Sequence, residues 1–130
     1  NPALILTDFT VDYQDIQEDH PLFRYIKNRM ATAYITSNGK LGLLVFRIAQ
    51  KLGLRIPGDI SIVTFDDPAA EYDASMFTHI SQSEDQMGRE AARMLIEVVE
   101  SGNRVGIKYR KVVLTPEMIV RQTTGRVSPQ

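Results

Sequence analysis

The segment that most constrains the fold is GLRIPGDISIVTFDD, which runs from Gly53 to Asp67. After its Pro-Gly-Asp turn comes a short apolar run, Ile60 to Phe65, that is rich in β-branched residues and predicts a buried strand. In parallel α/β sheets, ligands bind just beyond the carboxyl ends of strands. Two adjacent carboxylates, Asp66 and Asp67, therefore follow the predicted strand at its carboxyl end, where ligands commonly bind.

A strand and a helix precede this segment. Residues 32–36 have the composition of a strand, and residues 40–52 repeat apolar side chains at intervals of three and four, which indicates an amphipathic helix. Gly53 is suited to end that helix in a left-handed conformation. The resulting strand–helix–strand unit favours a parallel sheet with a right-handed crossover.

Shorter patterns extend this α/β arrangement on both sides. A capping box from Ser83 to Gln86 is predicted to open one helix, and the His20-Pro21 pair suits the start of another. The further expected elements are strands at 4–7, 78–82, 107–114 and 117–121, and a helix at 83–101 that Gly102 can close.

Composition limits the classes of partner. The 130 residues fit one domain or a piece of a larger one. Fifteen basic and sixteen acidic side chains nearly cancel, so no general attraction to nucleic acid or to an anionic membrane is expected. The chain has no cysteine and shows neither a signal peptide nor an apolar run long enough to span a bilayer. We expect a cytoplasmic protein without a membrane partner.

Four side chains are candidate ligand contacts, and each has a plainer reading. Asp66, with its neighbour Asp67, contacts a ligand or caps backbone amides in a turn. Asn38 lies between a strand and a helix, where it hydrogen-bonds a ligand or serves as the N-cap. Phe9 stacks on a ring or belongs to the core. Gln82 hydrogen-bonds a ligand or is a surface residue.

Motifs for catalysis or for cofactors are missing. The two histidines, His20 and His79, lack a metal-ligand spacing, and no GxSxG nucleophile motif occurs. Gly39 and Gly42 match neither of the glycine-rich phosphate loops. We therefore expect no metal, no cofactor and no enzymatic activity, although an α/β enzyme that uses Asp66 remains one alternative.

The order and spacing of several segments together resemble the effector-binding domain of LacI/GalR-type (lactose-repressor-like) transcription regulators, over about residues 32–124. The segments are SNGKLGLL, GLRIP, DISIVTFDD, FTHISQ, MGREAA and LTPEMIVRQTT, starting at Ser37, Gly53, Asp59, Phe77, Met87 and Leu114. The resemblance implies a periplasmic-binding-protein-like fold with two α/β lobes around a cleft. Residues 1–130 would then be the carboxyl-terminal part of that domain, with a mainly parallel sheet flanked by helices.

The resemblance also implies roles for the candidate residues. Asn38 falls on a position that hydrogen-bonds the effector, and Asp66 on a carboxylate that accepts sugar hydroxyls. Gln82 falls at the crossing between lobes, and Phe9 is compatible with an aromatic that stacks on the ligand. The effector would be a sugar or a related small metabolite, and its binding would alter a DNA-binding domain that this chain lacks.

The chain departs from the family pattern near these residues. Gly39 stands where the family commonly has Asp, and Thr64 stands where it usually has Gly. Near the crossing, Met76 and His79 replace Pro and Thr. These differences leave the identity of the effector open.

The resemblance assigns the helix at 83–101 to the other lobe, most of which this chain lacks. Its apolar face needs a surface, so the helix either folds back on its own sheet or pairs with a second copy; the plainer alternative is a mobile segment. We expect a homodimer or larger assembly, with residues 83–101 in the contact. The face is made by Met87, Ala91, Met94, Leu95 and Val98. The rival function is a solute-binding protein of a sugar transport system, which has the same fold.

Overall fold

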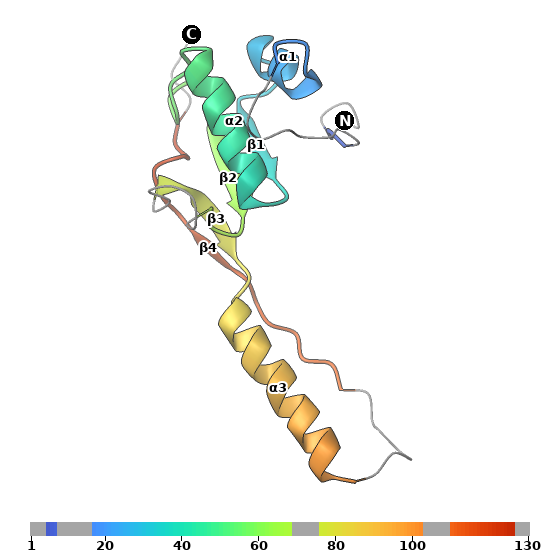
Figure 1. The fold of residues 1–130 in the computed structure, drawn as a ribbon. Helices are drawn as coiled ribbons and strands as arrows, with labels where there is room; N and C mark the ends of the chain where they lie inside the picture. The colour runs from blue at the N-terminus through green and yellow to red at the C-terminus, as the bar shows by residue number, and fades with distance from the viewer. Residues whose placement is uncertain (1–4, 8–16, 69–75, 103–109, 127–130) are drawn as a thin grey trace.

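The computed structural model describes residues 5–7, 17–68, 76–102 and 110–126. These residues form a four-stranded sheet, in the order β1-β2-β3-β4, with one helix, α2 (Gly39–Lys51), packed on it (Figure 1). Strands β1 (Ala33–Thr36), β2 (Ser61–Phe65) and β3 (Thr78–Ser81) run parallel, whereas β4 (Glu117–Ile119) is antiparallel to β3. The expected mainly parallel sheet is confirmed.

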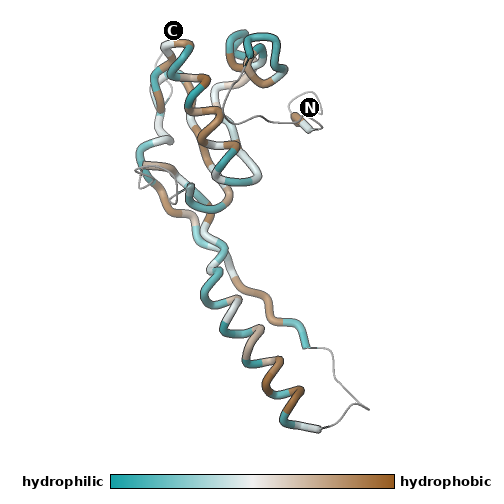
Figure 2. Tube along the Cα trace, in the orientation of Figure 1, coloured by the Kyte–Doolittle hydropathy of each residue, from teal (hydrophilic) through white to brown (hydrophobic). Residues whose placement is uncertain are grey.

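Helix α2 supplies most of the core. Its apolar stripe packs on one face of β1 and β2, and Figure 2 shows brown apolar positions alternating with teal polar ones along this helix. Helix α1 (Pro21–Lys27) packs on α2, and the His20 imidazole caps it by accepting a hydrogen bond from the Leu22 amide. The buried apolar side chains are Leu22, Phe23, Ile26, Tyr34, Leu43, Leu44, Val45, Ile48, Ala49, Ile60, Ile62 and Phe77.

The turn that leads into β2 is fastened by an ion pair. The Asp59 carboxylate accepts hydrogen bonds from the Arg55 amide at 2.8 Å and from the Arg55 guanidinium at 2.9 and 3.1 Å. The guanidinium holds the pKa of Asp59 well below its usual range. Gly53 ends α2 with a φ of 67°, the left-handed conformation that its sequence position predicts.

The second face of the sheet is open. Ile35 on β1 is 73% exposed and Met118 on β4 is 56% exposed, and Phe65 between them is also exposed. Parallel sheets are normally covered by helices on both faces. The described residues therefore provide one of the two layers that such a sheet requires.

Helix α3 (Glu84–Glu100) extends away from the sheet, and residues 110–116 return beside it to β4 (Figure 1). None of its side chains is buried; Leu95 and Val99 are 64% and 70% exposed. The alternative in which this helix folds back on its own sheet is therefore wrong. No described helix has the length and apolar character that a membrane crossing requires.

Three other sequence predictions fail. Ser83 adopts a left-handed conformation, with φ 52° and ψ 48°, and its side chain makes no capping hydrogen bond, so the predicted capping box is absent. Residues 110–114 form no strand because they lie along α3 instead of along a sheet edge, and 107–109 fall outside the described residues. Of the strand predicted at 4–7, residues 5–7 form no strand and residue 4 lies outside the described residues; β4 is shorter than predicted.

Candidate functional site

The carboxyl ends of the three parallel strands lie at one edge of the sheet. Thr36 on β1 pairs with Thr64 on β2, and Phe65 on β2 pairs with Ile80 on β3. Because the strands are parallel and in this register, the residues that follow them share that edge. Asn38, Asp66 and Gln82 are those residues.

Asp66 and Gln82 are in direct contact. The Gln82 side-chain amide donates a hydrogen bond to Asp66 Oδ1 at 2.8 Å, and the Asp66 backbone amide donates to the Ile80 carbonyl at 3.1 Å. Asp66 has a φ of 63°, which non-glycine residues seldom adopt. This contact joins two of the predicted ligand residues across β2 and β3.

Asn38 is the N-cap of α2. Its Oδ1 accepts a hydrogen bond from the Leu41 amide at 2.9 Å, so the plainer reading from the sequence is realised. Capping uses the oxygen of the side-chain amide and leaves the two donors of Nδ2 for another group. The same side chain can therefore cap the helix and donate to a ligand.

Two adjoining hollows share Asp66 and Asp67. One has a volume of about 250 Å³ and is lined by Asn38, Gly39, Lys40, Leu43, Asp66, Asp67 and Pro68. The other has a volume of about 200 Å³ and is lined by Asp66, Asp67, His79, Ser81, Gln82 and Glu84. Carboxylate oxygens accept hydrogen bonds and amide or ammonium groups donate them, so this edge offers both functions to a polar ligand.

Two side chains here were not singled out as ligand candidates from the sequence. His79 is buried, its Nδ1 lies 3.0 Å from the Phe77 carbonyl oxygen, and its Nε2 lies 4.0 Å from Asp67 Oδ2. Lys40 lines the first hollow beside Asn38. The signal for His79 is its register with Thr64, which only strand pairing reveals.

Phe9 lies outside the described residues, so its stacking role stays a prediction. Among the parts of the chain that the structure describes, no group of three or more His, Asp or Glu side chains is arranged to hold a metal ion.

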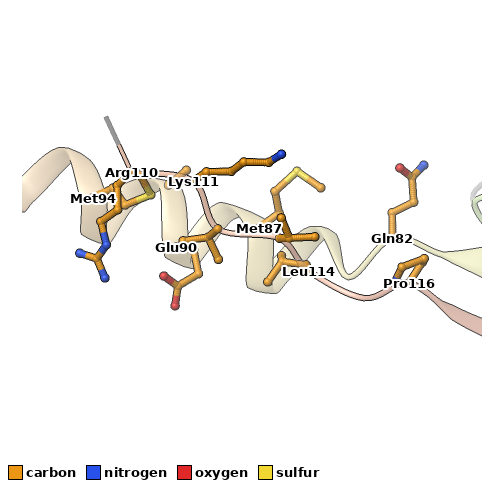
Figure 3. A pocket seen from close by; sticks show the side chains of 11 residues that line it. Gln82, Met87, Glu90, Met94, Arg110, Lys111, Leu114 and Pro116 are labelled. Carbon is orange, nitrogen blue, oxygen red and sulfur yellow. The ribbon is translucent and has the colours of Figure 1, made fainter. Parts of the chain in front are cut away.

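A larger hollow of about 600 Å³ lies along α3, away from most of the predicted residues (Figure 3). Met87 and Met94 from α3 and Leu114 from the returning segment make its lining mainly apolar. Gln82 and Pro116 border one end, so this hollow begins where the strand-end site stops. Its apolar lining suits packing against protein more than recognition of a polar ligand.

Charged side chains tie the returning segment to α3. Arg93 donates to Glu90 and to Glu97, both at 2.6 Å, and Arg110 donates to Glu97 at 2.7 Å. The two carboxylates raise the pKa of the Arg93 guanidinium, with Glu90 as the larger cause. Helix and segment therefore form one paired arm.

Comparison with known proteins agrees with this architecture. The family described as "Periplasmic binding protein-like domain" matches residues 5–124. The arabinose metabolism transcriptional repressor of Geobacillus stearothermophilus is 35% identical over 78% of this chain, which spans 28% of that repressor. The chain thus covers less than a third of that relative's length. Curated relatives of this kind are named as repressors and not as enzymes.

Solved structures of two regulators are also similar. A LacI-family transcriptional regulatory protein from Corynebacterium glutamicum is 27% identical with a TM-score of 0.63, over 84% of this chain and 40% of that one. A complex of the transcriptional regulator CelR with cellobiose is 27% identical with a TM-score of 0.63, over 78% of this chain and 31% of that one. The chain therefore belongs to the periplasmic-binding-protein-like domain family, in the form found in LacI/GalR-type transcription regulators.

Proposed function

We propose that this chain is the carboxyl-terminal part of the effector-binding domain of a transcription regulator, and that it binds a sugar-like small molecule at the ends of β1, β2 and β3. The observation that carries this proposal is the convergence of Asn38, Asp66 and Gln82 at one sheet edge, beside two small hollows. In open α/β sheets, ligands bind at the carboxyl ends of the strands.

The chemistry of this edge suits hydroxyl groups. The Asp66 carboxylate accepts hydrogen bonds from hydroxyls, the Asn38 Nδ2 group donates to them, and the Gln82 amide both donates and accepts. A pyranose or furanose ring presents several hydroxyls within the span of such a cluster. Phe9 is proposed to cover the apolar side of the ring, as the family resemblance implies.

The open surfaces support a larger domain around this chain. The uncovered sheet face at Ile35 and Phe65 and the exposed apolar side chains of α3 each require a partner surface. We propose that α3 belongs to a second lobe, so that Gln82 marks the crossing between the lobes. Closure of the lobes around the effector would then shift operator affinity, provided that the effector binds one state better than the other.

The remaining partners follow from the same assignment. Operator DNA would be bound by a domain outside this chain, and the regulator would act in the cytoplasm as a homodimer or larger assembly. The repressor names of the curated relatives favour this function over that of a solute-binding protein.

Calorimetric titration of the full-length protein with arabinose and cellobiose tests the proposal. Asp66→Ala should weaken binding of the recognised sugar by about 1–3 kcal/mol, because it leaves the sugar hydroxyl and the Gln82 amide without their acceptor. Asp85→Ala is the matched control, since Asp85 is an exposed aspartate whose partner is Arg89 on the same helix. Undiminished affinity in the Asp66 variant would remove Asp66 from the site.

A further inference from the structure

Two buried threonines hydrogen-bond the backbone of the proposed site. Thr36 and Thr64 are register partners on β1 and β2, and both are buried. The Thr36 hydroxyl donates to the Asn38 carbonyl at 3.0 Å, and the Thr64 hydroxyl donates to the Asp66 carbonyl at 2.8 Å. Each threonine therefore fastens the backbone of a candidate ligand residue two positions further along the chain.

Asp66 needs this support more than Asn38 does. The left-handed backbone of Asp66, with a φ of 63°, is unfavourable for a residue with a Cβ atom, whereas Asn38 is extended. Such conformations persist where the surroundings hold them in place. The Thr64 hydroxyl holds the Asp66 carbonyl, while the Asp66 amide donates to Ile80 on the neighbouring strand.

The packing around Thr64 fixes the direction of its hydroxyl. Thr64 is 0% exposed, and its methyl group fills the space that Gly42 leaves on α2. A Cβ atom at Gly42 would lie 2.1 Å from Thr64 Cγ2. Because threonine has a stiff χ1 and no room to turn here, its oxygen stays directed at Asp66.

We propose that Thr64 is a positioning residue that holds Asp66 in the conformation in which its carboxylate meets Gln82 at the ligand site. This inference rests on the proposed function only for its effect on ligand binding. The effect on the backbone conformation of Asp66 follows from the hydrogen bond that the Thr64 hydroxyl donates to the Asp66 carbonyl. Specificity for the effector would then depend on a side chain that does not touch it.

The test compares three variants of the full-length protein, in crystal structures and in titrations with arabinose and cellobiose. Thr64→Val keeps the shape but removes the donor, Thr64→Ser keeps the donor, and Thr123→Val is the matched control. Thr123 is also fully buried; its hydroxyl donates to the Ile62 carbonyl at 2.7 Å and accepts from the Thr78 amide at 2.9 Å, but it lies at the amino ends of β2 and β3, away from Asp66. If Thr64→Val disturbs folding, Thr64→Ala removes the same hydroxyl without adding bulk.

We expect Thr64→Val to release Asp66 from its positive φ and from Gln82, and to weaken sugar binding about three- to tenfold, the scale of one lost hydrogen bond. Thr123→Val should keep the Asp66 conformation and the affinity, and Thr64→Ser, which keeps the donor but lacks the methyl group that fixes its direction, should fall between wild type and Thr64→Val. A Thr64→Val structure with Asp66 and Gln82 unchanged would overturn the inference. Unchanged sugar affinity in Asp66→Ala would instead overturn the proposed function and leave the structural result to decide the role of Thr64.

Discussion

Replacing Gly42 by alanine should destabilise the protein, although alanine favours helices. In the interior of a helix this substitution stabilises by about 1 kcal/mol when space is free. Here the added Cβ atom would lie 2.1 Å from the Thr64 methyl carbon and 3.2 Å from Thr36 Oγ1. Both neighbours are buried, short and β-branched, so neither can move away easily.

Overpacking of a buried contact costs about 1–3 kcal/mol. The 2.1 Å between the added Cβ atom and Thr64 Cγ2 places this substitution at the upper end of that range. When the gain in helix propensity is subtracted, we expect Gly42→Ala to lower the free energy of unfolding by about 1–2 kcal/mol. Urea unfolding followed by circular dichroism measures the loss as a shift in midpoint at constant slope.

Two further variants separate the clash from other effects. Gly42→Ala combined with Thr64→Ser removes the obstructing methyl group, so the double variant should recover about 1 kcal/mol relative to the sum of the single changes. Gly88→Ala is the matched control, because a Cβ atom at Gly88 has no neighbour within 4 Å and should increase helicity. A Gly42→Ala protein as stable as wild type would refute the close approach of α2 to β2.

Three other predictions concern charge, assembly and DNA. Arg55 lowers the pKa of Asp59 in the folded state. The ion pair therefore contributes fully to the free energy of unfolding at neutral pH, and this contribution is lost as the pH falls below about 4. Asp59→Asn should remove this part of the pH dependence of urea midpoints. Sedimentation of residues 1–130 at micromolar concentration should show a dimer or larger species, and replacing Met94 and Leu95 by Glu should release monomer; a well-folded wild-type monomer would contradict this. A mobility-shift assay should find no sequence-selective DNA binding by residues 1–130, because the chain is near neutral.

The strand–helix–strand unit could be predicted from the sequence because its signals are local. The apolar stripe of residues 40–52, Gly53 and the β-branched run from Ile60 all describe the same α2 and β2 that the structure contains. Pro21 likewise marked the start of α1. In each case propensity, pattern and turn chemistry agree with the packing.

The failures arise where tertiary context overrides a local pattern. Ser83 to Gln86 has the residues of a capping box, but Ser83 takes up a left-handed conformation at the exit from the sheet, and its hydroxyl does not cap. Residues 110–114 include the apolar run Val112 to Leu114, yet they lie along α3, with Arg110 paired to Glu97 on that helix. Neither outcome is encoded in the spacing of the residues.

The candidate site was predictable in part. Strand ends and the family resemblance bring together Asn38, Asp66 and Gln82, whose convergence depends on a parallel register that pattern alone suggests. The support from Thr64 was not predictable. Its hydrogen bond follows from the positive φ of Asp66 and from the room that Gly42 leaves, and both are properties of the folded chain.

The operator affinity of the full-length regulator, measured by fluorescence anisotropy with and without the sugar that it binds, tests whether the ends of β1, β2 and β3 form the effector site. We expect this sugar to change operator affinity in wild type and in Asp85→Ala. Asp66→Ala should bind the operator but should have lost the response at the same sugar concentration. An Asp66→Ala protein that responds to the sugar as wild type does would contradict a ligand site at the ends of β1, β2 and β3.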